Sequence, residues 1–253
     1  MRPTNPATSP AQYDAVGERY LQFKRSHNPL PEQHTVRRLL GNVSGADVLD
    51  LACGYGHYTR LVKQLGAKTA VGVDISAEMV ALARRIEQDE PTGAAYHVHD
   101  VASMPVLGTF QAATAVWLFN YADSPDQLAS MFTALHANLL PGGRLVAITI
   151  GPDYDPSGPS WEPYGLRVVD AAPGFRHTEL AMDILSTPPT RLRYRRWDRD
   201  VYEEAATSAG LAAPVWHPAE IPADAIARKG EAYWQPYRAN PFLAAFDTYR
   251  PRT

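Results

Sequence analysis

Residues 48–56 read VLDLACGYG, a short apolar stretch that runs directly into a turn with two glycines. We predict a buried strand at 48–51 and, from the helical spacing of apolar residues, a helix at 57–65. Glycine at positions 54 and 56 allows a sharp turn and a close approach of the backbone to a ligand. The stretch therefore predicts a strand–turn–helix unit of an α/β protein.

The alternation of strand and helix continues after this unit. Further strands are predicted at 70–73, 95–98, 111–119 and 144–150, and helices at 78–88 and from the capping sequence 124–127 to about 139. Residues 141–143, Pro-Gly-Gly, are predicted to form a turn. Alternating strands and helices predict a doubly wound, Rossmann-like, mostly parallel sheet with right-handed crossovers.

The flanking segments have a different pattern. Helical spacing of apolar residues predicts helices at 13–23 and 31–40, before the first strand. After a Pro- and Gly-rich loop at 151–158, three strands without helices between them predict antiparallel additions to the sheet. The three strands are predicted at 167–169, 179–185 and 191–196. They are followed by a final helix at 198–209 and a last edge strand at 212–216.

Composition excludes several function classes. The 253 residues are 45% hydrophobic, which is enough for a substantial core, and 24 basic against 27 acidic residues argue against binding of nucleic acid through bulk positive charge. The longest apolar run, 112–119, is too short to cross a membrane, and the N-terminus lacks the apolar core of a signal peptide. The single cysteine, Cys53, excludes an internal disulfide. We expect a cytoplasmic enzyme.

Carboxylates follow the strands at the edge where a parallel sheet binds its ligands. Asp74 ends the second strand, where it can accept hydrogen bonds from both hydroxyls of a ribose, and Asp100 follows the third. Asp50 precedes the glycines, and its charge would oppose a pyrophosphate but suit a ligand with an ammonium and a sulfonium, such as S-adenosylmethionine. A nicotinamide-dependent oxidoreductase, the competing reading, would need a third small residue where Thr59 stands.

Four motifs in order resemble those of class I S-adenosylmethionine-dependent methyltransferases: VLDLACGYG at 48–56, VGVDIS at 71–76, HDV at 99–101 and LPGG at 140–143. The resemblance covers about residues 46–150. Ala52 departs from the glycine usual in the family. The segment Tyr13-Asp14 to Tyr20 resembles the N-terminal lid of small-molecule methyltransferases. GEAYW at 230–234, through Asn240-Pro241, resembles bacterial enzymes of the toxoflavin methyltransferase type.

The resemblance implies a domain organisation and a set of cofactor contacts. Residues 1–45 would form a helical lid, 46–151 the cofactor-binding core, and 152–253 the substrate region of the same domain. Ala52 and Gly54 would face the methionine moiety. The further implied contacts are Asp74 with the ribose, Ile75 with the adenine face, Asp100 with the adenine amino group, Val101 with the ring through its N–H, Trp117 near the sulfonium, and Tyr13 and Tyr20 closing over the cofactor; Asp50 and Met79 complete the predicted set.

The acceptor side of the site is less defined. Trp161, Tyr164, His177 and Trp234 are candidates for substrate binding, although packing of the added strands explains the aromatic residues almost equally well. His97 and His99 share a strand face but have no third partner at suitable spacing, so we expect no metal. No residue is identified as a general base, and Cys53 is expected to be only a small loop residue.

The resemblance implies transfer of a methyl group to a nitrogen or oxygen of a small molecule, such as a heteroaromatic secondary metabolite. Two alternatives stay open: a protein of the same fold without methyl transfer, serving as a binding module or catalysing another reaction, and a nicotinamide-dependent oxidoreductase. We expect a small-molecule substrate, and neither nucleic acid nor a membrane as partner. The sequence does not determine the oligomeric state.

Overall fold

The computed structural model describes residues 30–252 and is built around a seven-stranded sheet of order β3-β2-β1-β4-β5-β10-β9. Strands β1 to β5 are parallel, and β10 lies between β5 and β9 and is antiparallel to both. Their bounds are β1 Asp47–Leu51, β2 Thr69–Asp74, β3 Ala95–Val98, β4 Phe110–Val116, β5 Leu139–Ile150, β9 Val215–Pro218 and β10 Leu243–Tyr249. The predicted doubly wound, mostly parallel sheet is confirmed.

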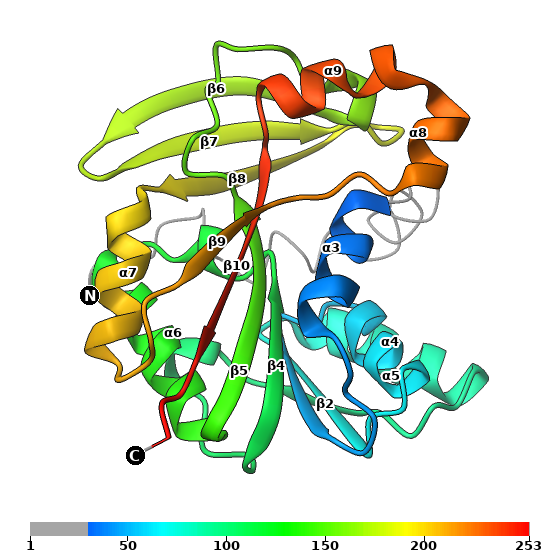
Figure 1. Cartoon of the computed structure of the whole chain (residues 1–253), viewed down its shortest axis with the longest axis vertical. Helices are drawn as coiled ribbons and strands as arrows, with labels where there is room; N and C mark the ends of the chain where they lie inside the picture. The colour runs from blue at the N-terminus through cyan, green and yellow to red at the C-terminus, as the bar shows by residue number, and fades with distance from the viewer. Residues whose placement is uncertain (1–29, 253) are drawn as a thin grey trace.

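Helices cover both faces of this sheet (Figure 1). On one side lie α3 (Leu30–Leu40), α4 (His57–Gln64) and α5 (Ala77–Asp89), and on the other lie α6 (Pro125–Asn138) and α7 (Arg199–Ser208). The chain order along the sheet reverses between β1 and β4. The connections that leave the carboxyl ends of β1 and β4 therefore pass over opposite faces of the sheet. Ligands of open α/β sheets bind at such a point.

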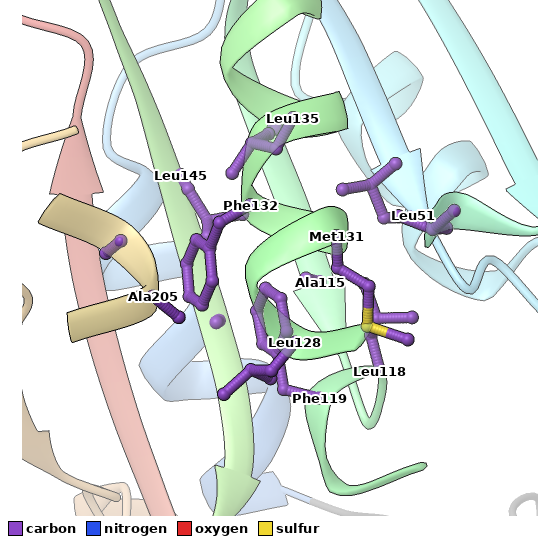
Figure 2. Packing of buried hydrophobic residues seen from close by; sticks show 14 of the residues in the cluster. Leu51, Ala115, Leu118, Phe119, Leu128, Met131, Phe132, Leu135, Leu145 and Ala205 are labelled. Atoms are coloured by element: carbon purple, nitrogen blue, oxygen red, sulfur yellow. The ribbon is translucent and has the colours of Figure 1, made fainter. Parts of the chain in front are cut away.

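The largest apolar cluster lies between the sheet and helices α6 and α7 (Figure 2). The Phe119 and Phe132 rings stack with centroids 4.6 Å apart, and both side chains are fully buried. Helix α6 begins as the capping sequence predicts, because the Ser124 hydroxyl accepts a hydrogen bond from the Gln127 N–H. The well-packed core fixes the strand ends in place.

A second, three-stranded sheet lies beyond the carboxyl ends of the parallel strands (Figure 1). It consists of β6 (Leu166–Gly174), β7 (His177–Ile184) and β8 (Thr190–Trp197), all antiparallel as predicted. The predicted antiparallel additions after the fifth strand are confirmed, and they form a sheet of their own. Strand β6 extends past the predicted 167–169 because its backbone stays paired with β7 to the hairpin turn.

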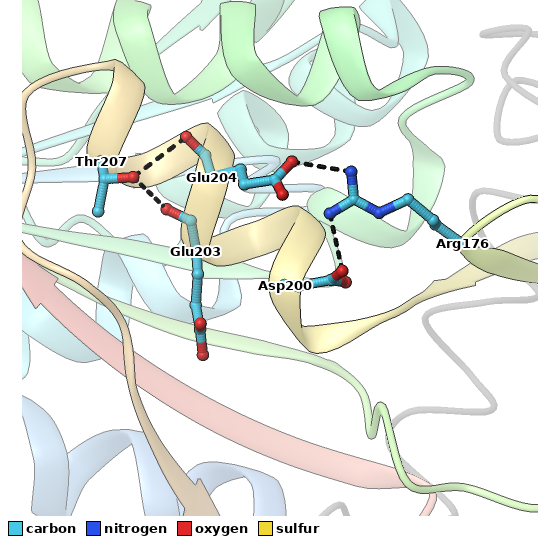
Figure 3. A network of polar contacts seen from close by, with 5 residues as sticks. All are labelled: Arg176, Asp200, Glu203, Glu204 and Thr207. Atoms are coloured by element: carbon cyan, nitrogen blue, oxygen red, sulfur yellow. Dashed lines mark hydrogen bonds and ion pairs between the residues drawn. The ribbon is translucent and has the colours of Figure 1, made fainter.

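The β6–β7 hairpin is anchored to helix α7 through one arginine (Figure 3). The Arg176 guanidinium binds the carboxylates of Asp200, at 2.9 Å, and Glu204, at 2.8 Å. The Thr207 hydroxyl, one turn further along α7, donates to the Glu203 carbonyl oxygen. The two ion pairs of Arg176 therefore connect the second sheet to a helix that covers the main sheet.

The largest differences from prediction lie in the last third of the chain. Helix α7 is not the final helix, because α8 (Ala223–Lys229) and α9 (Glu231–Ala239) follow it. Strand β10, which lies beyond the last predicted strand, is inside the main sheet. Strand β9 is an edge strand as predicted, but it begins three residues later than expected and is not the last strand.

The predicted turn at 141–143 is also part of strand β5. Its backbone makes hydrogen bonds like those between paired strands. The Gly142 N–H donates to the Arg250 carbonyl, and the Arg250 N–H donates to the Gly143 carbonyl. This pairing depends on a segment about a hundred residues away, which the local sequence does not reveal. Strand β4 ends earlier than expected, at Val116. Among residues 30–252, every helix is too short or too polar to cross a membrane.

Candidate functional site

The carboxyl ends of the first strands lie side by side. Leu51 at the end of β1 is in register with Val73 on β2 and Ala115 on β4. The residues that follow each strand therefore meet at one edge of the sheet, next to the point where strand order reverses. The sequence motifs that follow β1, β2 and β3 lie at this edge, whereas LPGG at 140–143 opens β5 at the opposite end of the sheet.

The turn after β1 has an unusual backbone conformation. Ala52, Gly54 and Gly56 have φ angles of 56°, 54° and 81°, all in the left-handed region that favours glycine. A Cβ at Gly56 would lie 2.5 Å from the Tyr96 hydroxyl, so that position admits no side chain. The turn is thus built for a backbone that passes close to its neighbours, and Ala52 is its one strained residue.

The strain at Ala52 is testable by substitution. We expect Ala52→Gly to raise the free energy of unfolding by about 0.5–1 kcal/mol, because the left-handed conformation costs alanine about 1–2 kcal/mol and glycine's greater freedom when unfolded returns part of that gain. Urea unfolding measures the change. The control, Ala129→Gly inside helix α6, should lower stability by about 1 kcal/mol. An equal loss of unfolding free energy in Ala52→Gly and Ala129→Gly would contradict the strain assigned to Ala52.

Asp74 at the end of β2 is held by backbone amides on both sides. Its Oδ2 accepts from the Gly54 N–H at 2.8 Å, and its Oδ1 accepts from the Ser76 N–H at 2.9 Å. The side chain is 8% exposed. The carboxylate therefore connects the glycine turn to the start of α5 in a fixed orientation.

Asp50 lies deeper than Asp74 and is 1% exposed. Its Oδ2 accepts from the Thr59 hydroxyl on α4 and its Oδ1 from the Thr114 hydroxyl on β4, both at 2.7 Å. Burial raises the pKa of Asp50 to about 6, partly offset by these hydrogen bonds. In the structure Asp50 joins β1 to α4 and β4, and a direct contact with a cofactor stays a prediction.

Cys53 is buried between these carboxylates. Burial, together with the charges of Asp74 and Asp50, raises the pKa of its thiol well above the ordinary value. Since the thiolate is the nucleophilic form, this cysteine is poorly suited to covalent catalysis.

The predicted adenine contacts flank Asp74. Ile75 is 41% exposed, which leaves an apolar surface directly beside the carboxylate. The Asp100 carboxylate accepts from the Ala102 N–H at 2.9 Å and caps a short 3-10 helix in which Val101 comes first. Met79 is 2% exposed and lies beneath the glycine turn, with its Cε 3.7 Å from a Cβ built at Gly54.

Trp117 follows β4 with a φ of 65°, a strained conformation for a tryptophan. Its indole Nε1 donates to the Glu32 carboxylate at 2.7 Å, and its ring stacks on Phe242 with centroids 5.7 Å apart. Glu32, on α3, also accepts from the Tyr58 hydroxyl on α4 and is 2% exposed. Burial and the charge of Glu32 raise the pKa of Tyr58 well above its ordinary value.

Sequence reasoning did not identify Glu32. The signal for it was present, since Glu32 precedes the buried Val36 by four residues and so shares its helical face. An acidic residue on the apolar face of a helix indicates a buried partner.

Three of the four candidate substrate residues come together in one aromatic cluster. The Tyr164 ring lies 5.0 Å from Trp161 and 5.7 Å from Trp234. The Trp161 Nε1 donates to the Asn240 carbonyl and the Trp234 Nε1 to the Ala225 carbonyl. Their indole N–H groups thus join α9 to α8 and the end of α9 to the segment before β6, which favours the packing interpretation.

His177 is separate from this cluster. It opens β7, and its ring lies 5.0 Å from Trp197. The other end of β7, Ile184, is in register with Leu166, close to Tyr164 in sequence. Seven residues of strand correspond to roughly 23 Å, so the structure does not bring His177 together with the other three.

Tyr13 and Tyr20 lie outside the described residues. Within residues 30–252, no group of three His, Cys, Asp or Glu side chains could hold a metal ion.

The residues at the strand ends fit S-adenosylmethionine. Asp74 would supply its ribose with a hydrogen-bond acceptor in a fixed orientation, and the exposed Ile75 would supply its adenine with an apolar surface. Gly56 is required by the neighbouring Tyr96 ring, whereas a Cβ at Gly54 would meet only the Met79 methyl at 3.7 Å, so the backbone at Gly54 would let a ligand approach closely.

Comparison with known proteins agrees with this geometry. Residues 48–143 match a family described as a methyltransferase domain. A ubiquinone biosynthesis O-methyltransferase of Sodalis glossinidius is 30% identical over 148 residues, 55% of this chain and 57% of that protein. A demethylmenaquinone methyltransferase of Lactiplantibacillus plantarum is 34% identical over 166 residues, 62% of this chain and 69% of that protein. The match to the first of these relatives thus spans little more than half of its length.

A solved structure extends the likeness to nearly the whole fold. An S-adenosylmethionine-dependent methyltransferase from Mesorhizobium loti superposes with a TM-score of 0.66 at 19% identity, covering 88% of this chain and all of that one. The glycine turn, the amide-held Asp74, the sheet order and these relatives point to one family. This chain belongs to the class I S-adenosylmethionine-dependent methyltransferases.

Proposed function

We propose that this protein transfers a methyl group from S-adenosylmethionine to an oxygen or nitrogen of a small molecule. The observation that carries the proposal is the Asp74 carboxylate, fixed by two backbone N–H groups at the end of β2 and adjoining the exposed Ile75. A carboxylate held in this way binds two hydroxyls without reorganising, and the neighbouring apolar surface binds a flat base.

When bound, the cofactor supplies a methyl group on a positively charged sulfur, and transfer to the acceptor breaks the C–S bond and leaves its electron pair on sulfur. The chain contributes mainly positioning and exclusion of water. We assign the wall of the site at the end of β4 to Trp117, whose indole is fixed by Glu32 on one side and by the Phe242 ring on the other. A rigid apolar wall keeps water from a reactive methyl group.

Two lines of support favour an aromatic acceptor. The relatives from Sodalis glossinidius and Lactiplantibacillus plantarum are named for ubiquinone biosynthesis and for demethylmenaquinone, and the first is named as an O-methyltransferase. The resemblance of residues 230–241 to toxoflavin-type enzymes points to a heteroaromatic nitrogen instead. As the atom that receives the methyl group, we propose a hydroxyl oxygen on an aromatic ring first and a nitrogen of a heteroaromatic ring second.

Mass spectrometry tests the proposal. The purified protein is incubated with S-adenosylmethionine and separate panels of hydroxylated aromatic and nitrogen heteroaromatic compounds. We expect at least one compound to gain a single methyl group, with one S-adenosylhomocysteine formed per methylated product. Boiled protein is the control.

The alternatives give different results. A binding module of the same fold would bind S-adenosylmethionine in calorimetry while leaving every acceptor unmodified. An oxidoreductase would bind a nicotinamide cofactor and not S-adenosylmethionine. Either result would overturn the proposal.

A further inference from the structure

Asn120 is buried with an amide that has no hydrogen-bond partner. It is 1% exposed, and neither its Oδ1 nor its Nδ2 makes a hydrogen bond. In the other two buried asparagines within residues 30–252, both the oxygen and the nitrogen of the side-chain amide make hydrogen bonds. Asn138 accepts from the Leu107 N–H and donates to the Ala134 carbonyl, and Asn240 accepts from the Asp155 N–H and donates to the Asp155 carbonyl.

Asn120 lies just beyond the carboxyl end of β4. It belongs to a short 3-10 helix, Phe119–Tyr121, that begins two residues after the strained Trp117. The helix is fixed on both sides. Phe119 stacks on Phe132 in the core, and the Tyr121 ring lies 5.3 Å from Tyr194 on β8 of the second sheet. Asn120 is thus between the main sheet and the second sheet.

An arginine strengthens this junction. Arg195 on β8, 8% exposed, donates from Nη1 to the Ala122 carbonyl just after the 3-10 helix. The backbone around Asn120 therefore has little freedom to carry the amide to another partner. Burying an amide without partners costs about 1–3 kcal/mol, so native proteins hold few such groups and each of them calls for an explanation.

We propose that the Asn120 amide binds the methyl acceptor, and that the acceptor is a ring with a hydroxyl next to a second oxygen. This inference rests on the proposed methyl transfer. A primary amide presents one acceptor and one donor side by side. Its Oδ1 accepts a hydrogen bond from the hydroxyl of the ring, and its Nδ2 donates to the neighbouring oxygen. The Tyr121 and Tyr194 rings, inclined at 53° to each other, place two aromatic side chains at the same junction.

The test compares 3,4-dihydroxybenzoate, which has paired oxygens, with 4-hydroxybenzoate, which has one. We expect the wild-type protein to methylate the first with the higher kcat/KM. Asn120→Leu should raise the KM for 3,4-dihydroxybenzoate about tenfold and remove the preference, because a pair of neutral hydrogen bonds is lost. The dissociation constant for S-adenosylmethionine should not change.

Thermal unfolding separates a binding role from a structural one. Asn120→Leu should keep or raise the unfolding midpoint, since it removes unpaired polar atoms from the interior. Asn138→Leu, the matched control, should lower the midpoint, because it leaves the Leu107 N–H and the Ala134 carbonyl unpaired. A lower midpoint in Asn120→Leu, or an unchanged KM, would overturn the inference.

Failure of the inference is distinguishable from failure of the proposed function. If the wild-type protein binds S-adenosylmethionine but methylates no compound of either panel, methyl transfer itself is wrong. If it methylates only acceptors without paired oxygens, the proposed function stands and the role given to Asn120 is wrong.

Discussion

Replacing Asp74 by asparagine is expected to weaken S-adenosylmethionine binding about 100-fold. The carboxylate is held by the Gly54 and Ser76 N–H groups, and in the proposed function it accepts from two ribose hydroxyls. Hydrogen bonds to a charged group contribute about 1.5–3 kcal/mol, and 100-fold corresponds to about 2.7 kcal/mol. Asparagine keeps one acceptor oxygen but turns the other into a donor. Isothermal titration calorimetry measures the change.

S-adenosylhomocysteine carries the same ribose, so its affinity should fall by the same factor. The matched control is Asp47→Asn at the opposite end of β1, where the carboxylate accepts from the Thr69 hydroxyl on the neighbouring strand. That variant should bind both compounds as the wild type does. Unchanged affinity in a folded Asp74→Asn variant would remove Asp74 from the cofactor site.

Asp50 should make the stability of the protein fall as pH rises from about 4 to 7. Its pKa is ordinarily 3.8 and is raised to about 6 in the folded protein, because burial disfavours the charged form. The folded state therefore binds more protons than the unfolded state in this interval, so the stabilisation is complete below pH 3.8 and is lost through pH 6. At 1.36 kcal/mol per pKa unit, the loss is about 3 kcal/mol.

Urea unfolding of the wild type and Asp50→Asn at several pH values between 4.5 and 7.5 measures this contribution. Asparagine carries no charge, and the Thr59 and Thr114 hydroxyls can rotate to donate to its oxygen and accept from its amide. The difference in unfolding free energy between the two proteins should move in favour of the variant as pH rises. Parallel curves would show that Asp50 has an ordinary pKa in the folded protein.

The local patterns predicted most of the parallel half of the fold. Strand β1 and its glycine turn, helix α4 and the cap of α6 follow from nearby residues, because apolar spacing and capping chemistry act over a few positions. The strand-end position of Asp74 follows from the same patterns. What Asp74 and Asp50 contact does not, since the Gly54 N–H and the Thr114 hydroxyl come from other strands and loops.

The features that were missed depend on distant pairing. Strand β10 has only short apolar stretches, and its identity as a strand comes from its pairing with β5, in which Leu243 is in register with Ile150. Asn120 gave only a weak signal as a lone amide in an apolar run, and nothing local shows that its amide would be left unpaired. Such information resides in the packed structure.

The place of β10 between β5 and β9 also has a consequence for protein synthesis. Strand β5 is complete at Ile150, but its outer edge cannot be paired until the ribosome has added Leu243–Tyr249. At about 5–20 residues per second, the intervening residues 151–242 take roughly 5–20 s to translate. Throughout that time the nascent chain carries an open, apolar strand edge, which is the kind of surface that chaperones bind and that neighbouring chains on a polysome can pair with.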